Sequence, residues 1–257
     1  MSLPWETVDV LGAPVACIDL QGLLDLALAW SGGAERRTAL YVNAHALNSA
    51  LQEPALLSAW QSADLVYADG VGVVWAARWL YGRRLEKLTS ADWIHRLAAQ
   101  AAPLGRRWFL LGGAPGVAEL AGLRLEEAHP GVQIAGSYYG YFPDAATPAV
   151  LEMIRAAHPD LVFVGLGTPR QELWLTRQRA KIDAPLCWAV GALFDYLAGV
   201  ERRVPAGMNR LGLEWLFRLG MDPRGKWRRY LLGNPRFVGR VLAQKLDRSA
   251  PPAARKG

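Results

Sequence analysis

Short apolar runs alternate with amphipathic segments along most of the chain. The runs are rich in Val, Leu and aromatic residues, are typical of buried strands, and occupy residues 38–42, 65–68, 108–111, 132–135, 161–164 and 186–190. Segments with helical spacing lie between them, among others at residues 20–30, 44–51, 93–101 and 150–157. This order predicts a Rossmann-like α/β fold, with a mostly parallel sheet and helices on both faces. Residues 8–11 and 15–18 could add a small hairpin.

Glycine or a polar residue follows almost every predicted strand. The carboxyl ends of parallel strands meet at one edge of a sheet, and open α/β sheets bind ligands there. The candidates at this edge are Asn43, Asp69, Gly112, Gly167, Arg170, Gln171 and Asp195. Asn43 and Asp69 could instead cap the helices that follow them. Asp195 stands in an apolar context and could be either a ligand group or a structural cap.

The sequence LVFVGLGTPRQELWL concentrates these signals at residues 161–175. After the strand, Gly165 and Gly167 let the backbone approach a ligand closely. A helix N-cap, a first-turn proline and a capping-box glutamine are then predicted at Thr168, Pro169 and Gln171. The free N–H groups of such a helix start favour an anion. Arg170 would face the positive end of the helix, which an intervening anion would explain; the alternative is a solvated arginine.

Charge separates the chain into two parts. Residues 202–257 contain 14 Lys/Arg and 3 Asp/Glu, a balance of +11, whereas residues 1–201 contain 15 and 20, a balance of −5. We therefore expect an α/β catalytic domain at residues 1–200, a basic amphipathic helical appendage at 201–246 and a disordered tail at 247–257. The appendage mixes arginines with aromatic residues. It could be a packed helical pair with a solvated basic face, an interfacial membrane helix or a nucleic-acid surface.

Several motifs are missing. Cys17 and Cys187 have no CxxC partner and the histidines show no metal-ligand spacing, which indicates a reducing compartment and no zinc site. Neither a signal peptide nor a bilayer-spanning apolar run is recognisable. An arginine replaces the third glycine of a dinucleotide fingerprint at Arg170, so a nicotinamide-dependent oxidoreductase stays only an alternative. No Asp-x-Asp is present, so arginines and N–H groups would have to neutralise a bound diphosphate.

Six longer motifs occur in order along the chain. They are ADGVG from Ala68, FLLGGAPGV from Phe109, GSYYGYF from Gly136, VGLGTPRQE from Val164, VGALFDYLAG from Val190 and GLEWLFRL from Gly212. Together with Arg203, Pro205 and a Pro-Arg pair at 223–224, they resemble the WecG/TagA/CpsF glycosyltransferase family of bacterial cell-surface polysaccharide and teichoic-acid synthesis. The resemblance covers most of the chain, from about Tyr41 to Phe237.

The resemblance implies an inverting, metal-independent hexosyl- or N-acetylhexosaminyltransferase. It would move a sugar from a UDP-sugar to a polyprenyl-diphosphate-linked acceptor, without a cofactor. The basic appendage would complete the site and contact the inner face of the cell membrane, making the protein cytoplasmic and peripheral. Nucleic acid is not an expected partner on this interpretation, although a basic nucleic-acid-binding module remains the other alternative. The oligomeric state stays open, a homo-oligomer included.

The resemblance also implies roles for individual residues. Asp69 matches the family's proposed general base, which would take the proton of the acceptor hydroxyl. The substrate-binding residues carried over are Tyr41, Asn43, Lys87, Asp92, Gly165, Gly167, Arg170, Gln171, Glu172, Asp195, Arg203, Arg218, Arg224 and either Arg228 or Arg229. The chain departs from the family pattern at Tyr41, where a threonine is usual. It also departs at Lys87, which keeps the charge of the usual arginine without its bidentate geometry.

Overall fold

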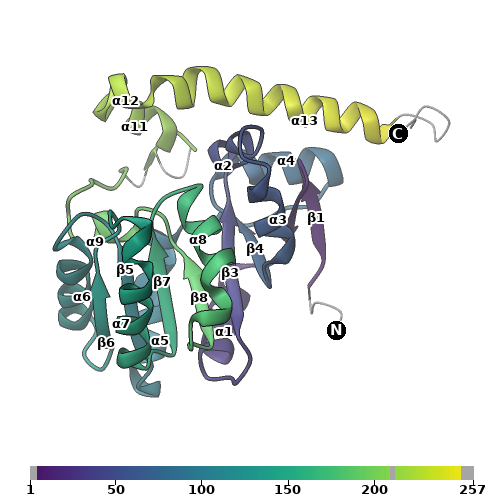
Figure 1. Ribbon diagram of the computed structural model, residues 1–257. Coiled ribbons are helices and arrows are strands. Elements are labelled where there is room, and N and C mark those ends of the chain that lie inside the picture. The colour runs from purple at the N-terminus through teal and green to yellow at the C-terminus, as the bar shows by residue number, and fades with distance from the viewer. Residues whose placement is uncertain (1–4, 206, 209–211, 250–257) are drawn as a thin grey trace.

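A six-stranded parallel sheet forms the centre of the computed structural model, which describes residues 5–205, 207–208 and 212–249. Its strands are β3 (Arg37–Val42), β4 (Leu65–Ala68), β5 (Arg107–Gly112), β6 (Gln133–Tyr138), β7 (Leu161–Gly165) and β8 (Leu186–Ala189). The strand order is β4-β3-β8-β7-β5-β6 and every pairing is parallel. A hairpin of β1 (Thr7–Val10) and β2 (Ala13–Ala16) forms a separate two-stranded sheet that packs against the same core. The predicted parallel α/β fold is confirmed (Figure 1).

Helices cover both faces of this sheet. They are α1 (Leu20–Ser31), α2 (Ala44–Ser49), α3 (Ala55–Ser62), α4 (Val71–Tyr81), α5 (Ser90–Ala101), α6 (Val117–Ala128), α7 (Thr147–Ala157), α8 (Arg170–Gln178) and α9 (Leu193–Leu197). The C-terminal helices are α11 (Glu214–Met221), α12 (Pro223–Trp227), η4 (Arg228–Leu232) and α13 (Gly233–Ser249). Among the described residues, no helix combines the length and the apolar character needed to cross a membrane.

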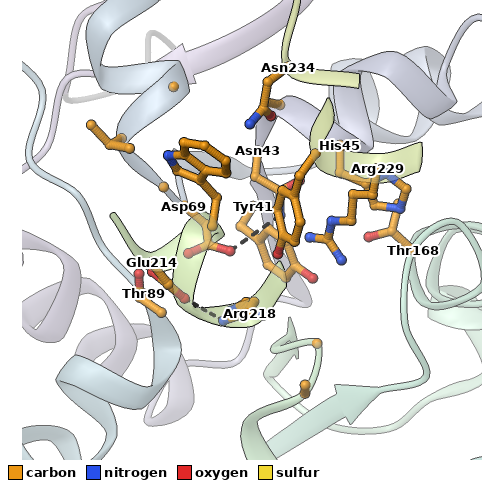
Figure 2. A pocket seen from close by; sticks show the side chains of 18 of the residues that line it. Tyr41, Asn43, His45, Asp69, Thr89, Thr168, Glu214, Arg218, Arg229 and Asn234 are labelled. Carbon is orange, nitrogen blue, oxygen red and sulfur yellow. Dashed lines mark hydrogen bonds and ion pairs between the residues drawn. The ribbon is translucent and has the colours of Figure 1, made fainter. Parts of the chain in front are cut away.

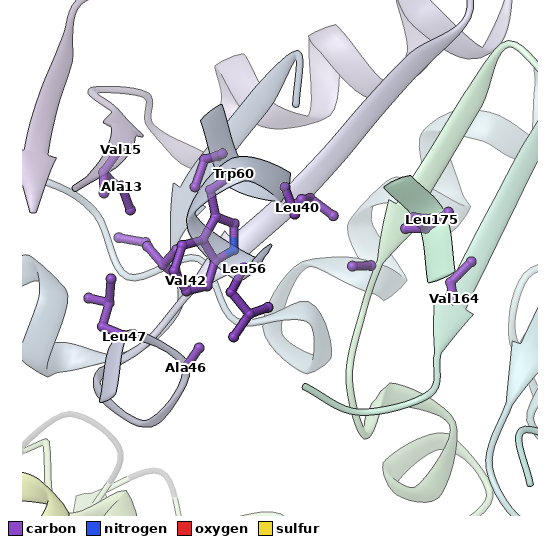
Figure 3. Packing of buried hydrophobic residues seen from close by; sticks show 14 of the residues in the cluster. Ala13, Val15, Leu40, Val42, Ala46, Leu47, Leu56, Trp60, Val164 and Leu175 are labelled. Carbon is purple, nitrogen blue, oxygen red and sulfur yellow. The ribbon is translucent and has the colours of Figure 1, made fainter. Parts of the chain in front are cut away.

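The period-two alternation of each strand separates the core into two layers. Leu40 and Val42 of β3 pack with α2, α3, α4, α7 and α8 on one face (Figure 3). Ala39 and Tyr41, the alternate residues of the same strand, pack with α1, α5, α6 and α9 on the other face. Successive side chains of a strand point to opposite faces, and both faces of this sheet are covered by helices. Side chains on both faces of a central strand are therefore buried, which explains why the strands appear in the sequence as continuous apolar runs.

Three local predictions need correction. The helix expected at residues 93–101 begins earlier, because α5 starts at Ser90. The strand expected at residues 132–135 ends later, because β6 continues to Tyr138. The capping box at α8 is wrong: Pro169 is the N-cap residue, and no side chain caps the helix. The side chains of Thr168 and Gln171 do not bond to the helix N-terminus; both donate hydrogen bonds to the buried carboxyl group of Glu172.

The C-terminal helices lie across the edge of the sheet where its strands end (Figure 1). Phe237 and Val241 of α13 are buried in the core layer that contains α2 and α4. The Asn48 side chain donates to the Gly233 carbonyl at 2.7 Å, and Arg240 donates to the Leu47 carbonyl. α13 continues past the predicted end of the appendage at residue 246, and residues 250–257 of the predicted disordered tail lie outside the described part.

The ends of β5 and β7 lie so close together at this edge that Gly112 has no room for a side chain. A Cβ atom on Gly112 would lie 2.3 Å from the carbonyl oxygen of Gly165. We expect Gly112→Ala to lower the free energy of unfolding by about 1–3 kcal/mol, because β5 and β7 would have to move apart. Urea denaturation measures this. The control is Gly239→Ala on α13, where nothing lies within 4 Å of an added Cβ and where a gain of about 0.5–1 kcal/mol is expected. Equal stability of the two variants would contradict the prediction.

Candidate functional site

A cavity of about 590 Å³ lies between the carboxyl edge of the sheet and the C-terminal helices. From the sheet it is lined by residues that follow the strands, Asn43, Asp69, Gly167, Thr168, Val190 and Gly191. From the C-terminal helices it is lined by Glu214, Trp215, Arg218, Arg229, Tyr230, Asn234, Phe237 and Val238. Neither half alone encloses it, so the cavity exists only with the basic appendage in place.

Asp69 stands at the end of β4 and faces this cavity (Figure 2). It does not cap α4, since Gly70 occupies the N-cap position without a side-chain hydrogen bond. Asn43 does cap α2, accepting from Ala46 N at 2.9 Å, and its amide also donates to Asp69 Oδ2 at 3.4 Å. Burial, and secondly the charge of Glu214, raise the pKa of Asp69. A carboxylate with a raised pKa is a better proton acceptor for a hydroxyl than an exposed one.

A chain of ion pairs connects the C-terminal helices to the sheet domain at this side of the cavity. Glu214 of α11 pairs with Arg218, one turn further along the same helix, and with Lys87 at 3.8 Å. Lys87 lies 3.7 Å from Asp92, which also pairs with Arg203. The predicted residues Lys87, Asp92 and Arg203 are therefore not among the residues that line the cavity. They belong to the ion-pair chain that ends at Glu214 and Arg218 in its wall.

The proximity of Glu214 to Asp69 predicts a pH effect. Removing the charge in Glu214→Gln would lower the pKa of Asp69, because a like charge disappears and Arg218 loses its partner. The acid limb of the kcat/KM profile should therefore move to lower pH. The matched control is Glu152→Gln, which removes a surface ion pair with Arg155 on α7. An acid limb that does not move in the Glu214 variant would contradict this coupling.

The opposite side of the cavity is cationic. Figure 2 shows Arg229, His45 and Thr168 together, across from Asp69 and Glu214. No carboxylate of the described residues pairs with Arg229, and its buried Nε atom has no hydrogen-bond partner. Burial, and secondly the charge of Arg229, lower the pKa of His45 to about 4, so this imidazole is neutral at pH 7. An unpaired guanidinium beside a neutral imidazole can accept an anion.

A buried polar network supports the loops that line the cavity floor. Glu172 Oε1 accepts from Gln171 Nε2 at 2.9 Å and from Thr168 Oγ1 at 2.8 Å. Gln171 in turn accepts from the N–H of Gly191 at 3.1 Å. Burial raises the pKa of Glu172. Gln171 and Glu172 therefore hold Thr168 and Gly191 in place from below, whereas Tyr41 reaches the cavity itself.

Arg170 has a different environment from the one its position suggested. Its guanidinium donates to the carbonyls of Gly140 and Phe142 and lies 4.9 Å from the Phe142 ring centre. It does not line the cavity. These contacts tie the loop after β6 to the start of α8. They explain the position of this arginine at the helix start without a bound anion. A substrate contact of Arg170 stays a prediction.

Other predicted residues lie outside the cavity wall. Gly165 packs against the end of β8, where an added Cβ would lie 2.6 Å from the Gly191 carbonyl oxygen. Asp195 is on α9 and is not its N-cap residue, and its neighbour Tyr196 faces the cavity. Arg224 and Arg228 are exposed on the C-terminal helices. Their substrate contacts therefore stay predictions.

Sequence reasoning missed several lining residues. These are His45, Trp75, Thr89, Tyr196, Glu214, Trp215, Tyr230 and Asn234. Arg229 was named only as an alternative to Arg228. A signal did exist for Glu214, the only acidic residue in the GLEWLFRL motif. An acid that stands four residues before an arginine in a basic segment indicates an ion pair.

Comparison with known proteins identifies the family. Residues 8–251 match the model of the Glycosyl transferase WecG/TagA/CpsF family. The chain belongs to this family. A Bacillus spizizenii relative, an N-acetylglucosaminyldiphosphoundecaprenol N-acetyl-beta-D-mannosaminyltransferase, is 33% identical over 203 residues, 79% of this chain and 77% of its own. A Bacillus subtilis protein of the same name is 30% identical over 207 residues, 80% of this chain and 79% of its own.

Family membership confirms the resemblance seen in the sequence motifs. The protein is a glycosyltransferase, which decides against the nicotinamide-dependent oxidoreductase. The match extends over both the sheet domain and the C-terminal helices, up to the end of α13. The glycosyltransferase cavity is accordingly built from both parts of the matched region.

Proposed function

We propose that this glycosyltransferase moves N-acetylmannosamine from its UDP derivative to N-acetylglucosaminyl-diphospho-undecaprenol, with inversion at the anomeric carbon. The names of the two Bacillus relatives support the sugar and the acceptor. The observation that carries the proposal is the placement of a buried carboxylate, Asp69, across one cavity from an unpaired arginine, Arg229. Inverting transfer needs a base and a leaving-group site on opposite sides of the sugar.

Asp69 acts as the general base. It takes the proton from the acceptor hydroxyl while that oxygen attacks the anomeric carbon from the side opposite UDP. The raised pKa suits this task, and Asn43 orients the carboxylate through its amide. Glu214 and Arg218 close the same wall of the cavity.

Arg229 receives the diphosphate of the leaving UDP. The negative charge on the leaving oxygen grows in the transition state, and a guanidinium can donate two parallel hydrogen bonds to phosphate oxygens. Gly167 and Thr168 line the same cavity, with Thr168 on the side of Arg229 (Figure 2), and the N–H groups of such a loop can donate further hydrogen bonds to the diphosphate. We include no divalent metal, because the sequence has no Asp-x-Asp and these groups can take the charge.

The proposal is tested with the purified protein of residues 1–257, UDP-N-acetylmannosamine and an acceptor that has N-acetylglucosamine diphosphate on a single isoprene unit. Mass spectrometry should detect the disaccharide product with excess EDTA present, and NMR should show a β linkage. UDP-N-acetylglucosamine is the control donor and should react much more slowly. A product that forms only with added Mg²⁺, or an α linkage, would contradict the metal-free inverting mechanism. Equal use of both donors would contradict the sugar assignment.

The C-terminal helices bring this cavity to the inner surface of the cell membrane. They lie within residues 202–257, which have a balance of +11, and Arg224, Arg228 and Arg236 are exposed on them. Anionic lipid attracts such a surface by about 1 kcal/mol per basic residue near it. Co-sedimentation with vesicles that contain phosphatidylglycerol should be strong at low salt and weak at high salt. Equal binding to neutral vesicles would count against this arrangement.

A further inference from the structure

A strip of exposed apolar side chains runs along two neighbouring helices beside the cavity. We call it the apolar strip, and its members are Val71, Trp75 and Trp79 of α4 with Val238, Leu242 and Leu246 of α13. Each of these side chains is between 36% and 72% exposed. The Trp75 and Trp79 rings stack at 5.3 Å between centres. Large exposed apolar groups that cluster in this way mark a binding surface.

The two helices run side by side and in the same direction. Near their starts, a Cβ atom on Gly72 would lie 3.4 Å from the Phe237 ring. Near their ends, Arg248 Nη1 donates to the Tyr81 hydroxyl at 2.7 Å. Because Val238, Leu242 and Leu246 recur every four residues, they follow one flank of α13. Eight residues of helix extend this flank over about 12 Å.

The apolar strip begins inside the cavity. Val71, Trp75 and Val238 line the cavity wall, whereas Trp79 and Leu242 do not. The strip therefore starts in the cavity, where the N-acetylglucosamine diphosphate head of the acceptor would be held, and continues outward along α4 and α13. A ligand whose polar head occupies the cavity would have its apolar tail directed onto the strip. This continuity distinguishes the strip from a surface that merely faces a bilayer.

We propose that the apolar strip binds the first isoprene units of the lipid acceptor. This inference rests on the proposed function, because it takes the acceptor to be a polyprenyl diphosphate. A prenyl chain presents methyl branches and double bonds, which suit flat indole rings and branched Val and Leu side chains. Burying each methylene group of the chain favours binding by roughly fourfold, from about 0.8 kcal/mol. The strip thus selects a polyprenyl acceptor before any membrane is involved.

Calorimetry in lipid-free buffer tests this directly. The ligands are acceptors with N-acetylglucosamine diphosphate on one, two or three isoprene units, each below its micelle concentration. For the wild-type protein we expect Kd to fall at least tenfold from one unit to three. Leu242→Ser and Trp79→Ser should each remove most of that gain, raising Kd for the three-unit acceptor much more than for the one-unit acceptor.

The matched control is Leu123→Ser on α6, which removes an exposed leucine from a distant surface and should keep the tenfold gain. Kd values independent of chain length in the wild type would overturn the inference. A Leu242→Ser protein with an undiminished gain would overturn it too. Transfer to the one-unit acceptor is measured in parallel. Normal transfer without a chain-length effect defeats only the strip, whereas absence of both transfer and UDP binding defeats the proposed function.

Discussion

Asp69→Asn is expected to reduce kcat by about 10²–10⁴-fold while leaving the affinity for UDP nearly unchanged. The substitution keeps the shape of the side chain beside Asn43 but removes the group that accepts the proton. The loss should fall on kcat because a base acts in the transition state rather than in donor binding. Steady-state kinetics with UDP titration by calorimetry measure both quantities. Turnover close to the wild-type rate would show that another group is the base.

The same variant should be at least as stable as the wild type at pH 7. Burial raises the folded-state pKa of Asp69, so the folded protein holds this proton more tightly than the unfolded chain does. Stability is therefore lost as pH rises from the usual carboxyl value through the raised one. Asparagine has no charge to bury and avoids this loss. A variant that melts below the wild type at pH 7 by at least as much as it does near pH 4 would contradict the environment assigned to Asp69.

Arg229→Gln is expected to weaken UDP binding by about 10- to 100-fold, the range that follows from losing charged hydrogen bonds of roughly 1.5–3 kcal/mol. The guanidinium lines the cavity and no described carboxylate neutralises it, so its loss should not release a buried acid. The folded state should accordingly keep its melting temperature. Calorimetric titration with UDP and a thermal melt without ligand check the two expectations.

Arg228→Gln is the matched control for Arg229. It removes the same charge from the neighbouring residue, whose guanidinium lies 5.3 Å from the exposed Trp227 ring and outside the cavity. Its affinity for UDP should stay within about twofold of wild type, since exposed charges at a distance are screened by salt. If the Arg228 variant loses more affinity than the Arg229 variant, the diphosphate lies outside this cavity.

The fold could be predicted because its signals are local. The apolar runs that became β4 and β7 are flanked by glycine or aspartate, and their bounds changed by no more than one residue. The edge where Asn43, Asp69 and Gly167 meet followed from the parallel sheet, since all strands end on the same side. Local patterns thus placed one half of the site correctly.

The other half could not be read from local patterns. Glu214 and Arg229 reach the cavity because residues distant in sequence pack together, with Phe237 buried in the core of the sheet domain. The environment of Arg170 could not be predicted for the same reason. Its position at a helix start indicated an anion, but its guanidinium donates to the carbonyls of Gly140 and Phe142, which lie in a loop about 30 residues away in sequence. Tertiary partners decide which of several arginines is left unpaired.

A crystal structure of the protein with bound UDP would test the central claim most directly. The cavity between the sheet and the C-terminal helices predicts electron density for the diphosphate within hydrogen-bond distance of Arg229. The free end of that diphosphate should point across the cavity toward Asp69, where the sugar would lie. Density for the diphosphate against Arg170 at the start of α8, or outside the cavity, would contradict the assignment of both Arg229 and Asp69.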